Sequence, residues 1–415
     1  MIQFQITISK LKNISLVLLS LYILVLTSCR EDEGIIPEVI VPVVPVDSIP
    51  QDSSSVAPTD SIPQDSSLID SIIYTPRLLG FYLLNEANMG SNKSTLDYMN
   101  LITGEYHRNI YAAANPSVPK ELGDVGNDLQ IYGGRLYAVI NCSNKIEVMD
   151  KFTAKRLGQI DIPNCRYIQF HEGYAYVTSY AGPVEINPDY EQIGYVAKVD
   201  TATLQVVDRC LVGFQPDELE IVGNKIYVAN SGGYMVPNYE NTVSVIDINT
   251  FTEIKRIEVE INLHHLRADR HGNLWVTSRG DYYDVPSRLF WIDTHTDTYA
   301  GALDIPVAEF TLCGDSLYII GNQWSYYEYE WTIAYGIVNV ATKEIVSKNF
   351  ITDGEDKKMS MPYGIEVNPI TKDIYLTDAA NYVYPGSLYC FGKDGKKKWQ
   401  VQTGDIPAHF ALLYK

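Results

Sequence analysis

Lys225-Ile-Tyr-Val-Ala229, a short run in which apolar and aromatic side chains dominate, recurs with variations along the chain. Alternation with a period of two is typical of a β-strand that buries one face. The repeat distance, roughly 40–57 residues, is that of a repeat architecture and not of a single sheet. The other six copies are Leu79–Leu84, Arg135–Ile140, Tyr174–Thr178, Asn273–Thr277, Ser316–Ile320 and Asp373–Thr377.

Each copy has the same neighbours on both sides. Two apolar segments joined by a polar turn follow it, and these predict hairpins at Leu96–Tyr111, Ile146–Ile160, Val196–Cys210, Val243–Val259, Leu289–Leu303, Tyr335–Phe350 and Leu388–Val401. One short apolar segment accompanies each copy as an inner strand, at Leu129–Tyr132, Tyr167–Phe170, Leu219–Val222, Leu263–Ala268, Phe310–Cys313, Gly364–Val367 and His409–Leu412. No helical period lasts beyond two turns after residue 77.

Seven units of four antiparallel strands predict an all-β fold, a seven-bladed β-propeller over residues 77–415. The first unit lacks an inner strand, and His409–Leu412 is an inner strand with nothing after it. We therefore expect the C-terminal strand to complete the N-terminal blade and close the ring, which removes exposed sheet edges. Two separate β-sandwiches would leave the even sevenfold spacing unexplained.

Residues 1–28 have the layout of a signal peptide. Lys10 and Lys12 precede an apolar run, Ile14–Leu26, that is short for a membrane-spanning helix. The run ends in Leu26-Thr27-Ser28-Cys29, which resembles the bacterial lipobox, in which the cysteine becomes the lipidated first residue. We predict lipidation at Cys29; the alternative is an ordinary secretory signal with a chance cysteine.

Residues 29–76 are predicted to be a disordered tether rich in Pro, Ser and Asp. The segment Asp47–Ser54 recurs as Asp60–Ser67, and such a sequence buries too little apolar surface to fold. The acidic run Arg30-Glu31-Asp32-Glu33 resembles the surface-export signal of Bacteroidota lipoproteins, although a solvated charge run would look the same.

The net charge of the chain argues against polyanionic partners. The 415 residues contain 32 Lys and Arg against 51 Asp and Glu, a formal charge of −19. Such an acidic chain is unsuited to nucleic acids or to anionic membrane surfaces, so we expect contact with a membrane only through the N-terminal lipid. The five cysteines after Cys29 show no C-x-x-C spacing, which argues against structural zinc. Cys142 and Cys165 are candidates for a disulfide or for two buried thiols.

Aromatic residues concentrate in the connections between the second and third strands of a unit. Residues 178–194, 229–242, 277–288, 321–334 and 377–386 hold 13 aromatic residues among 67, against 11% in the whole chain. Loops usually lose aromatic residues to the core, so this enrichment favours a contact surface over loops that merely pack on one another.

In a propeller, the connections that lead into the inner strands lie on the same face and approach the axis. Polar residues there, within an aromatic rim, describe a site for a large amphipathic ligand. We predict the ligand-binding residues Asn127, Arg166, Tyr180, Tyr234, Tyr282, Tyr283, Trp324, Tyr363, Tyr382 and His409.

The sequence favours a binding protein over an enzyme. It contains neither G-x-S-x-G nor H-E-x-x-H, and we expect no catalytic residue, metal or catalytic cofactor. His264, His265 and His409 are placed to converge near the axis, which keeps a lyase or lactonase as the lesser alternative.

Six loop segments carry a resemblance to a known family: Asn85–Ser91, Glu121–Asn127, Asp161–Tyr167, Ala229–Tyr239, Ser278–Tyr283 and Gly404–His409. They resemble the seven-bladed propeller lipoproteins of gut Bacteroidota over about residues 77–415, and are most similar to those that capture cobalamin (vitamin B12). The resemblance implies cobalamin or another corrinoid as bound ligand, a TonB-dependent outer-membrane transporter as partner, and a lipid-anchored place on the cell surface. A glycan or a protein as ligand remains the alternative within the binding class.

Overall fold

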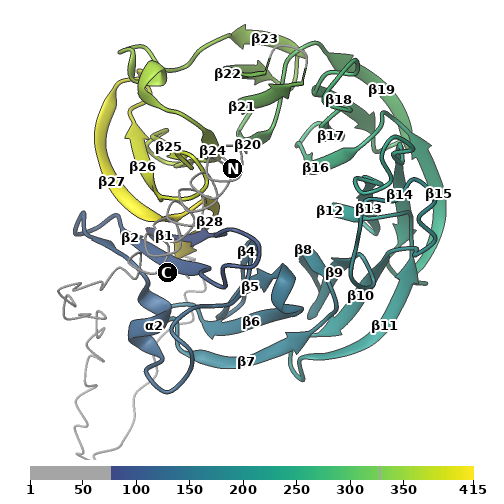
Figure 1. Cartoon of the computed structure of the whole chain (residues 1–415), viewed down its shortest axis with the longest axis horizontal. Coiled ribbons are helices and arrows are strands. Elements are labelled where there is room, and N and C mark those ends of the chain that lie inside the picture. Colours follow the sequence, from purple (N-terminus) through teal and green to yellow (C-terminus); the bar gives the residue numbers. More distant parts are fainter. Residues whose placement is uncertain (1–75, 327–328) are drawn as a thin grey trace, which may run out of the picture. The chain divides into compact units, whose positions relative to one another are not determined.

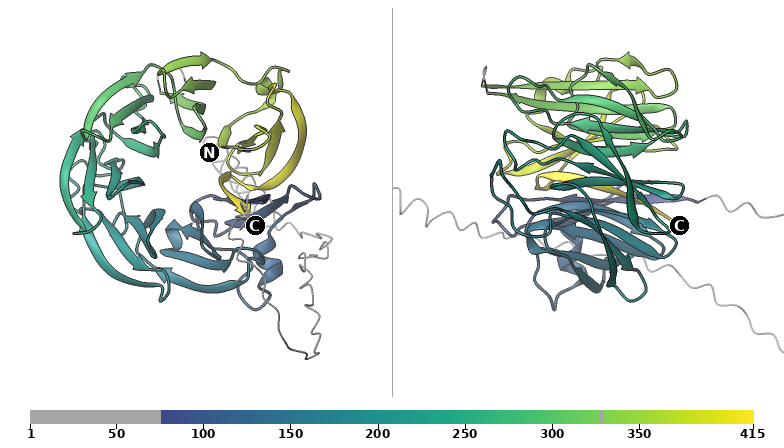
Figure 2. Two further views of the ribbon diagram at one scale, coloured as in Figure 1. Left: turned by 180° about the vertical axis from the view of Figure 1, so that it is seen from behind. Right: turned by 90° about the vertical axis from the view of Figure 1, so that its right-hand side faces the viewer.

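Seven four-stranded antiparallel sheets stand around one axis in the computed structural model of the chain, which describes residues 76–326 and 329–415 (Figure 1). Seen from behind, the same sheets complete the ring, with the C-terminus beside the first blade (Figure 2). The predicted all-β, seven-bladed propeller is confirmed. The predicted signal peptide, lipidated Cys29 and tether as far as residue 75 lie outside the described residues.

Each blade runs from an inner strand at the axis to an outer strand at the perimeter. The inner strands are β4 (Gly126–Tyr132), β8 (Cys165–His171), β12 (Pro216–Val222), β16 (Leu263–Ala268), β20 (Glu309–Cys313), β24 (Pro362–Val367) and β28 (Pro407–Tyr414). The second strands, which hold the repeated motif, are β5 (Arg135–Ile140), β9 (Tyr174–Ser179), β13 (Lys225–Asn230), β17 (Asn273–Ser278), β21 (Ser316–Ser325), β25 (Ile374–Asp378) and β1 (Leu78–Asn85).

The outer half of each blade is a hairpin, as predicted. Its third strands are β2 (Thr95–Asn100), β6 (Lys145–Asp150), β10 (Tyr195–Asp200), β14 (Thr242–Asp247), β18 (Arg288–Asp293), β22 (Glu330–Asn339) and β26 (Pro385–Phe391). Its fourth strands are β3 (Tyr106–His107), β7 (Arg156–Asp161), β11 (Gln205–Leu211), β15 (Thr252–Glu258), β19 (Thr298–Leu303), β23 (Glu344–Ser347) and β27 (Lys397–Asp405). Short helices are α2 (Ile110–Ala114), η1 (Asn141–Ser143) and η2 (Glu355–Lys358).

Two predicted segments have a different secondary structure, and several inner strands begin earlier than predicted. Residues 321–334 were expected to be a loop, but β21 and β22 continue through most of that range as one long hairpin, in which Trp324 pairs with Trp331. The first hairpin was expected to reach Tyr111, but its outer strand β3 has two residues and the chain then forms α2. In both places apolar residues alone did not distinguish a strand from a loop or a helical turn.

The apolar core is divided among the interfaces between neighbouring blades. Tyr137 and Val148 of the second blade, for example, pack in one cluster with Ile168 and Val177 of the third. Equivalent clusters join each successive pair of blades around the ring. Because each blade is buried only by its neighbours, the ring has to be complete for all of these faces to be covered.

The ring is closed by β28, which pairs with β1 from Leu78 opposite Tyr414 to Asn85 opposite Pro407. The predicted closure by the C-terminal strand is confirmed. Leu413 of β28 is 2% exposed and packs in the cluster between the first and second blades.

The five cysteines in the described part of the chain all carry free thiols, so no disulfide joins Cys142 to Cys165. The Cys165 sulfur is buried and lies 3.4 Å from the Lys145 carbonyl oxygen, whereas Cys142 is exposed and its sulfur lies 3.3 Å from Asn141 Oδ1. Proximity in the fold therefore did not bring the two sulfurs together, and only one of the two thiols is buried.

Closure of the ring can be tested with two leucines that differ in burial. We expect Leu413→Ala to lower the free energy of unfolding by about 2–5 kcal/mol, since it leaves a cavity in a packed interface. Leu211→Ala on the outer strand β11, where the leucine is 65% exposed, should change it by less than about 0.5 kcal/mol. Urea unfolding of both variants measures the difference, and equal losses would contradict the assigned closure.

Candidate functional site

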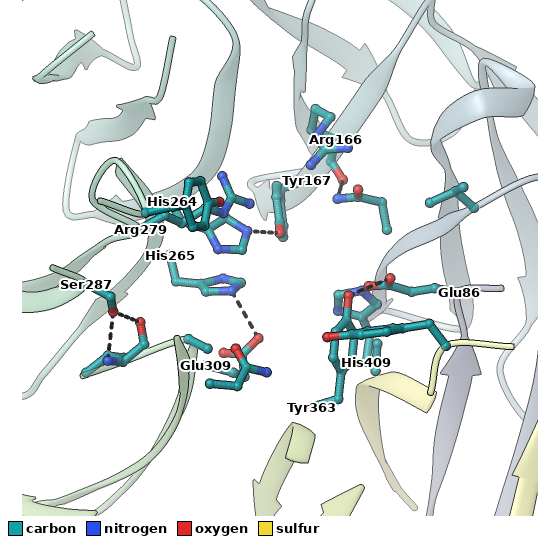
Figure 3. A pocket seen from close by; sticks show the side chains of 18 of the residues that line it. Glu86, Arg166, Tyr167, His264, His265, Arg279, Ser287, Glu309, Tyr363 and His409 are labelled. Atoms are coloured by element: carbon teal, nitrogen blue, oxygen red, sulfur yellow. Dashed lines mark hydrogen bonds and ion pairs between the residues drawn. The ribbon is translucent and has the colours of Figure 1, made fainter. Parts of the chain in front are cut away.

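A cavity of about 400 Å³ opens at the end of the axis where the inner strands begin and the second strands end (Figure 3). It therefore lies on the face predicted from the aromatic loops. Six blades contribute side chains to its wall, and the fourth blade supplies carboxylates directly behind it. All seven blades therefore contribute to the cavity or to its direct surroundings.

Irregular pairing at the start of the inner strands aims the polar side chains into this cavity. The ladder between inner and second strand skips residues 127, 166–167, 217–218, 264–265, 363–364 and 408. A bulge leaves residues unpaired and redirects their side chains, and bulges are frequent next to functional sites. Asn127, Arg166 and His264 thus reach the cavity through one recurrent local distortion.

One wall carries two arginines that share a buried carboxylate. Arg166 Nε lies 3.2 Å from Asp217 Oδ1, and Arg279 Nη1 lies 2.8 Å from Asp217 Oδ2. The Tyr180 hydroxyl donates a further hydrogen bond of 2.6 Å to Oδ1. Burial opposes ionisation of Asp217, but Arg279 and Arg166 outweigh it and hold the pKa of this carboxyl below its usual value. Asp217 and the two arginines therefore form a fixed ionic cluster.

A second cluster surrounds His265, which is buried between two carboxylates. Its Nδ1 lies 3.0 Å from Glu218 Oε2 and its Nε2 lies 3.2 Å from Glu309 Oε2. Glu218 also forms an ion pair with Arg267 and accepts a hydrogen bond from the Leu266 backbone amide. Although burial opposes ionisation, Arg267 and the hydrogen bond from His265 lower the pKa of Glu218 to about 2.

Across the cavity from Arg279, Glu86 joins the first and seventh blades (Figure 3). Its Oε1 lies 2.9 Å from His409 Nε2, and its Oε2 accepts a hydrogen bond of 2.9 Å from the Tyr363 hydroxyl. Burial disfavours the charged imidazole, but the hydrogen bond and charge of Glu86 raise the pKa of His409 above its usual value. Glu86 thus stabilises the charged form of His409.

His264 behaves in the opposite way to His409. Its Nε2 lies 2.9 Å from the Tyr167 hydroxyl, and no carboxylate contacts it among the described residues. Burial, followed by the charges of Arg279 and its other cationic neighbours, lowers the pKa of His264 well below its usual value. His264 is therefore neutral at neutral pH.

Aromatic residues form the rim. Tyr282 and Tyr382 line the cavity from the connections between second and third strands, and Trp331 lines it from the start of the third strand β22. Tyr282 and Tyr382 have φ angles of 66° and 64°, a left-handed conformation that is rare for bulky residues. Such conformations cost free energy and concentrate at functional sites, because the surrounding structure has to hold them.

The ten predicted ligand-binding residues divide into three groups. Those that line the cavity are Asn127, Arg166, Tyr282, Tyr363, Tyr382 and His409. Tyr180 lies behind the wall against Asp217, and Tyr234 packs edge-on against Tyr180 with ring centroids 6.3 Å apart. Tyr283 stacks on Tyr326 at 4.9 Å and Trp324 packs on Trp331 at 5.4 Å, so these two lie outside the cavity wall.

Sequence reasoning missed four lining residues that matter: Glu86, Tyr167, Arg279 and Glu309. Glu86 and Arg279 each follow a second strand directly, at equivalent positions of the first and fifth repeats. An alignment of the repeats at the ends of these strands would have placed both at the axis. The predicted convergence of His264, His265 and His409 is confirmed, since all three line the cavity.

Fold and site together define a seven-bladed β-propeller with a charge-paired polar cavity and an aromatic rim at one end of its axis. Residues 79–407 match the family described as Domain of unknown function (DUF5074), and the chain belongs to that family. No curated protein matches the chain. In the part of the chain that the structure describes, no helix is long and apolar enough to cross a membrane, and no three His, Cys, Asp or Glu side chains form a metal-binding group.

Solved structures that share the fold include the following two proteins. Hydrazine synthase of Kuenenia stuttgartiensis superposes with a TM-score of 0.54 at 14% identity, over 68% of this chain and 88% of that one. A quinonprotein alcohol dehydrogenase-like protein from Bacteroides thetaiotaomicron gives a TM-score of 0.54 at 13% identity, over 82% and 79% of the two chains. At these identities the likeness extends to the propeller architecture alone.

The pair of Glu86 and His409 should make stability depend on pH. A histidine whose pKa is raised by folding stabilises the protein below its unfolded pKa, and this contribution is lost as the pH rises through the folded pKa. We expect Glu86→Gln to reduce the free energy of unfolding by more at pH 6 than at pH 9, with a difference of about 1 kcal/mol.

Urea unfolding at the two pH values measures this difference, with Glu185→Gln in an exposed loop as the matched control. The control should cost the same small amount at both pH values. A larger loss for Glu86→Gln at pH 9 would contradict the assigned protonation of His409.

Proposed function

We propose that this protein is a surface-exposed lipoprotein that binds cobalamin or a related corrinoid and delivers it to a TonB-dependent transporter in the outer membrane. The observation that carries the proposal is the cavity at the mouth of the propeller, with aromatic residues on its rim and a floor of paired charges. Two of the loop segments that resemble cobalamin-capturing lipoproteins end at Asn127 and at His409. Asn127 and His409 both line this cavity.

The size of the cavity determines how such a ligand would sit. A volume of about 400 Å³ lies at the lower end of the range for small-molecule sites. A corrinoid is larger than a typical drug, so it would lie across the rim and insert only one face or edge. Tyr282, Tyr382 and Trp331 would supply apolar area to the corrin ring, as aromatic side chains do in other binding sites.

The polar floor suits the edge of the corrin ring, which carries amide side chains. Amides both donate and accept hydrogen bonds. Carboxylate oxygens of Glu86 and Glu309 can accept from amide nitrogen, while Asn127 and the two arginines can donate to amide oxygen. Because most of these charges are already paired, a polar ligand is not opposed by a large uncompensated field.

The proposal involves binding and release without chemistry. The ionic clusters fix their side chains before the ligand arrives, and a preorganised site reduces the entropy lost on binding. Slow release from many contacts would hold the ligand until a transporter competes for part of the same surface. The lipid on Cys29 and the tether would keep the propeller over the membrane while it moves.

Ligand binding can be tested by calorimetry with cyanocobalamin. We expect Tyr282→Ala and Trp331→Ala each to weaken binding by about 2 kcal/mol, roughly 30-fold, since central rings behave as hot spots. Tyr299→Ala on the outer strand β19, where the ring is 47% exposed, is the matched control and should change the affinity by less than about twofold.

Two outcomes would contradict the proposal. Wild-type protein that retains no cyanocobalamin would leave another ligand, such as a glycan or a protein, as the candidate. Product formed from a lactone or polyuronate panel would instead indicate a propeller lyase or lactonase.

Location can be tested on intact cells by protease shaving. We expect Cys29→Ala to abolish lipidation and surface display. Replacing Glu31, Asp32 and Glu33 with their amides should preserve the lipid but leave the protein on the periplasmic side of the outer membrane. Cleavage of the triple variant at the wild-type rate would contradict the export signal.

A further inference from the structure

The wall that carries Arg166 and Arg279 is assembled from three consecutive blades. Arg166 comes from the bulge of β8 in the third blade, and Arg279 follows β17 in the fifth. Asp217, from the bulge of β12, lies between them and contacts both. The two guanidinium groups are thus held on either side of one carboxylate, and Figure 3 shows both at the same side of the cavity.

The charges on this wall do not cancel. Asp217 carries one negative charge for two arginines, and its side chain is fully buried. His264, the neighbouring imidazole, is neutral and adds no charge. The carboxylates Glu86 and Glu309 lie elsewhere around the cavity, where they contact His409 and His265. The two guanidinium groups and Asp217 on this wall therefore sum to one positive charge.

The arginines also keep unused donors. A guanidinium has five N–H groups. Within the described residues, the side chain of Arg166 donates a hydrogen bond only through Nε, and that of Arg279 only through Nη1, both to Asp217. Asp217 Oδ1 also accepts a hydrogen bond from the Tyr180 hydroxyl. Both guanidinium groups thus keep further N–H donors, and both residues line the cavity.

Arg166 is fixed in place before any ligand binds. Its guanidinium carbon lies 4.9 Å from the centre of the Tyr180 ring, a cation–π contact. The Asn127 amide donates a hydrogen bond of 2.8 Å to the Arg166 carbonyl oxygen, which holds the backbone of the bulge. A rigid fork of N–H donors loses little entropy on binding a planar or tetrahedral oxyanion.

We propose that Arg166 and Arg279 form an anion-binding subsite that takes a singly charged phosphodiester of the ligand. This assignment rests on the proposed function, because cobalamin carries one phosphodiester in its nucleotide loop. A single negative charge matches the surplus charge on the wall. A carboxylate has similar recognition chemistry, so the test compares the two oxyanions directly.

The first arm of the test needs no corrinoid. The Nε–Hε signals of the arginines are followed by NMR during titration with dimethyl phosphate, and then with acetate, at constant ionic strength. We expect dimethyl phosphate to shift the Arg166 and Arg279 signals at concentrations at least threefold lower than acetate does. No shift with dimethyl phosphate, or tighter binding of acetate, would overturn the subsite.

The second arm compares cyanocobalamin with dicyanocobinamide, which lacks the nucleotide loop and its phosphodiester. We expect Arg279→Gln to weaken cyanocobalamin binding at least tenfold and dicyanocobinamide binding by less than about twofold. Arg209→Gln on the outer strand β11 removes the same charge away from the cavity and should leave both affinities within about twofold. Equal losses for the two corrinoids in Arg279→Gln would overturn the subsite.

Arg279→Lys is the control for a folding defect in Arg279→Gln. It keeps a positive charge beside Asp217 but loses the planar fork of N–H donors. We expect its thermal stability to match the wild type and its cyanocobalamin affinity to lie between those of the wild type and Arg279→Gln. If neither corrinoid binds the wild type, the proposed function fails, while the dimethyl phosphate titration still decides whether the subsite exists.

Discussion

The pairing of β28 with β1 is the constraint on which the rest of this structure depends. It turns seven sheets into a ring, and a ring forces the starts of seven inner strands to share one axis. Each apolar interface is then covered by a neighbouring blade, and no blade edge is left at the junction of the chain's two ends. The same closure brings residues as distant in sequence as Glu86 and His409 within 2.9 Å.

Crowding at the axis explains the chemistry of the cavity. Polar residues that bulges direct inward cannot all reach water, and a buried charge is costly unless it is paired. The clusters around Asp217, His265 and Glu86 meet this requirement, and each joins two or three blades. These clusters are therefore both inter-blade contacts and a preorganised set of donors and acceptors. A site of this kind suits recognition of a polar ligand held under an aromatic rim.

Local alternation in the sequence was enough to predict the second strands, the blade number and the closure, because those strands are buried and regular. The inner strands were predicted too short: Leu129 and Leu219 were expected to begin strands that in fact begin at Gly126 and Pro216. The missing residues are the bulges, where alternation breaks down, and they supply much of the cavity. Arg279 follows β17 and Glu309 begins β20, and both were missed because a lone charge at the end of a strand is usually solvated.

The central claim is that a corrinoid sits over this cavity, and the most direct measurement is the position of its cobalt. Crystals of the protein grown with cyanocobalamin can be examined by anomalous scattering at the cobalt absorption edge. We predict one strong peak at the mouth of the propeller, above the wall formed by Arg166 and Arg279 and beside Tyr282 and Trp331. A peak at the opposite face, near the hairpin turns of Asp247 and Asp293, would contradict this account, as would crystals with no bound cobalt.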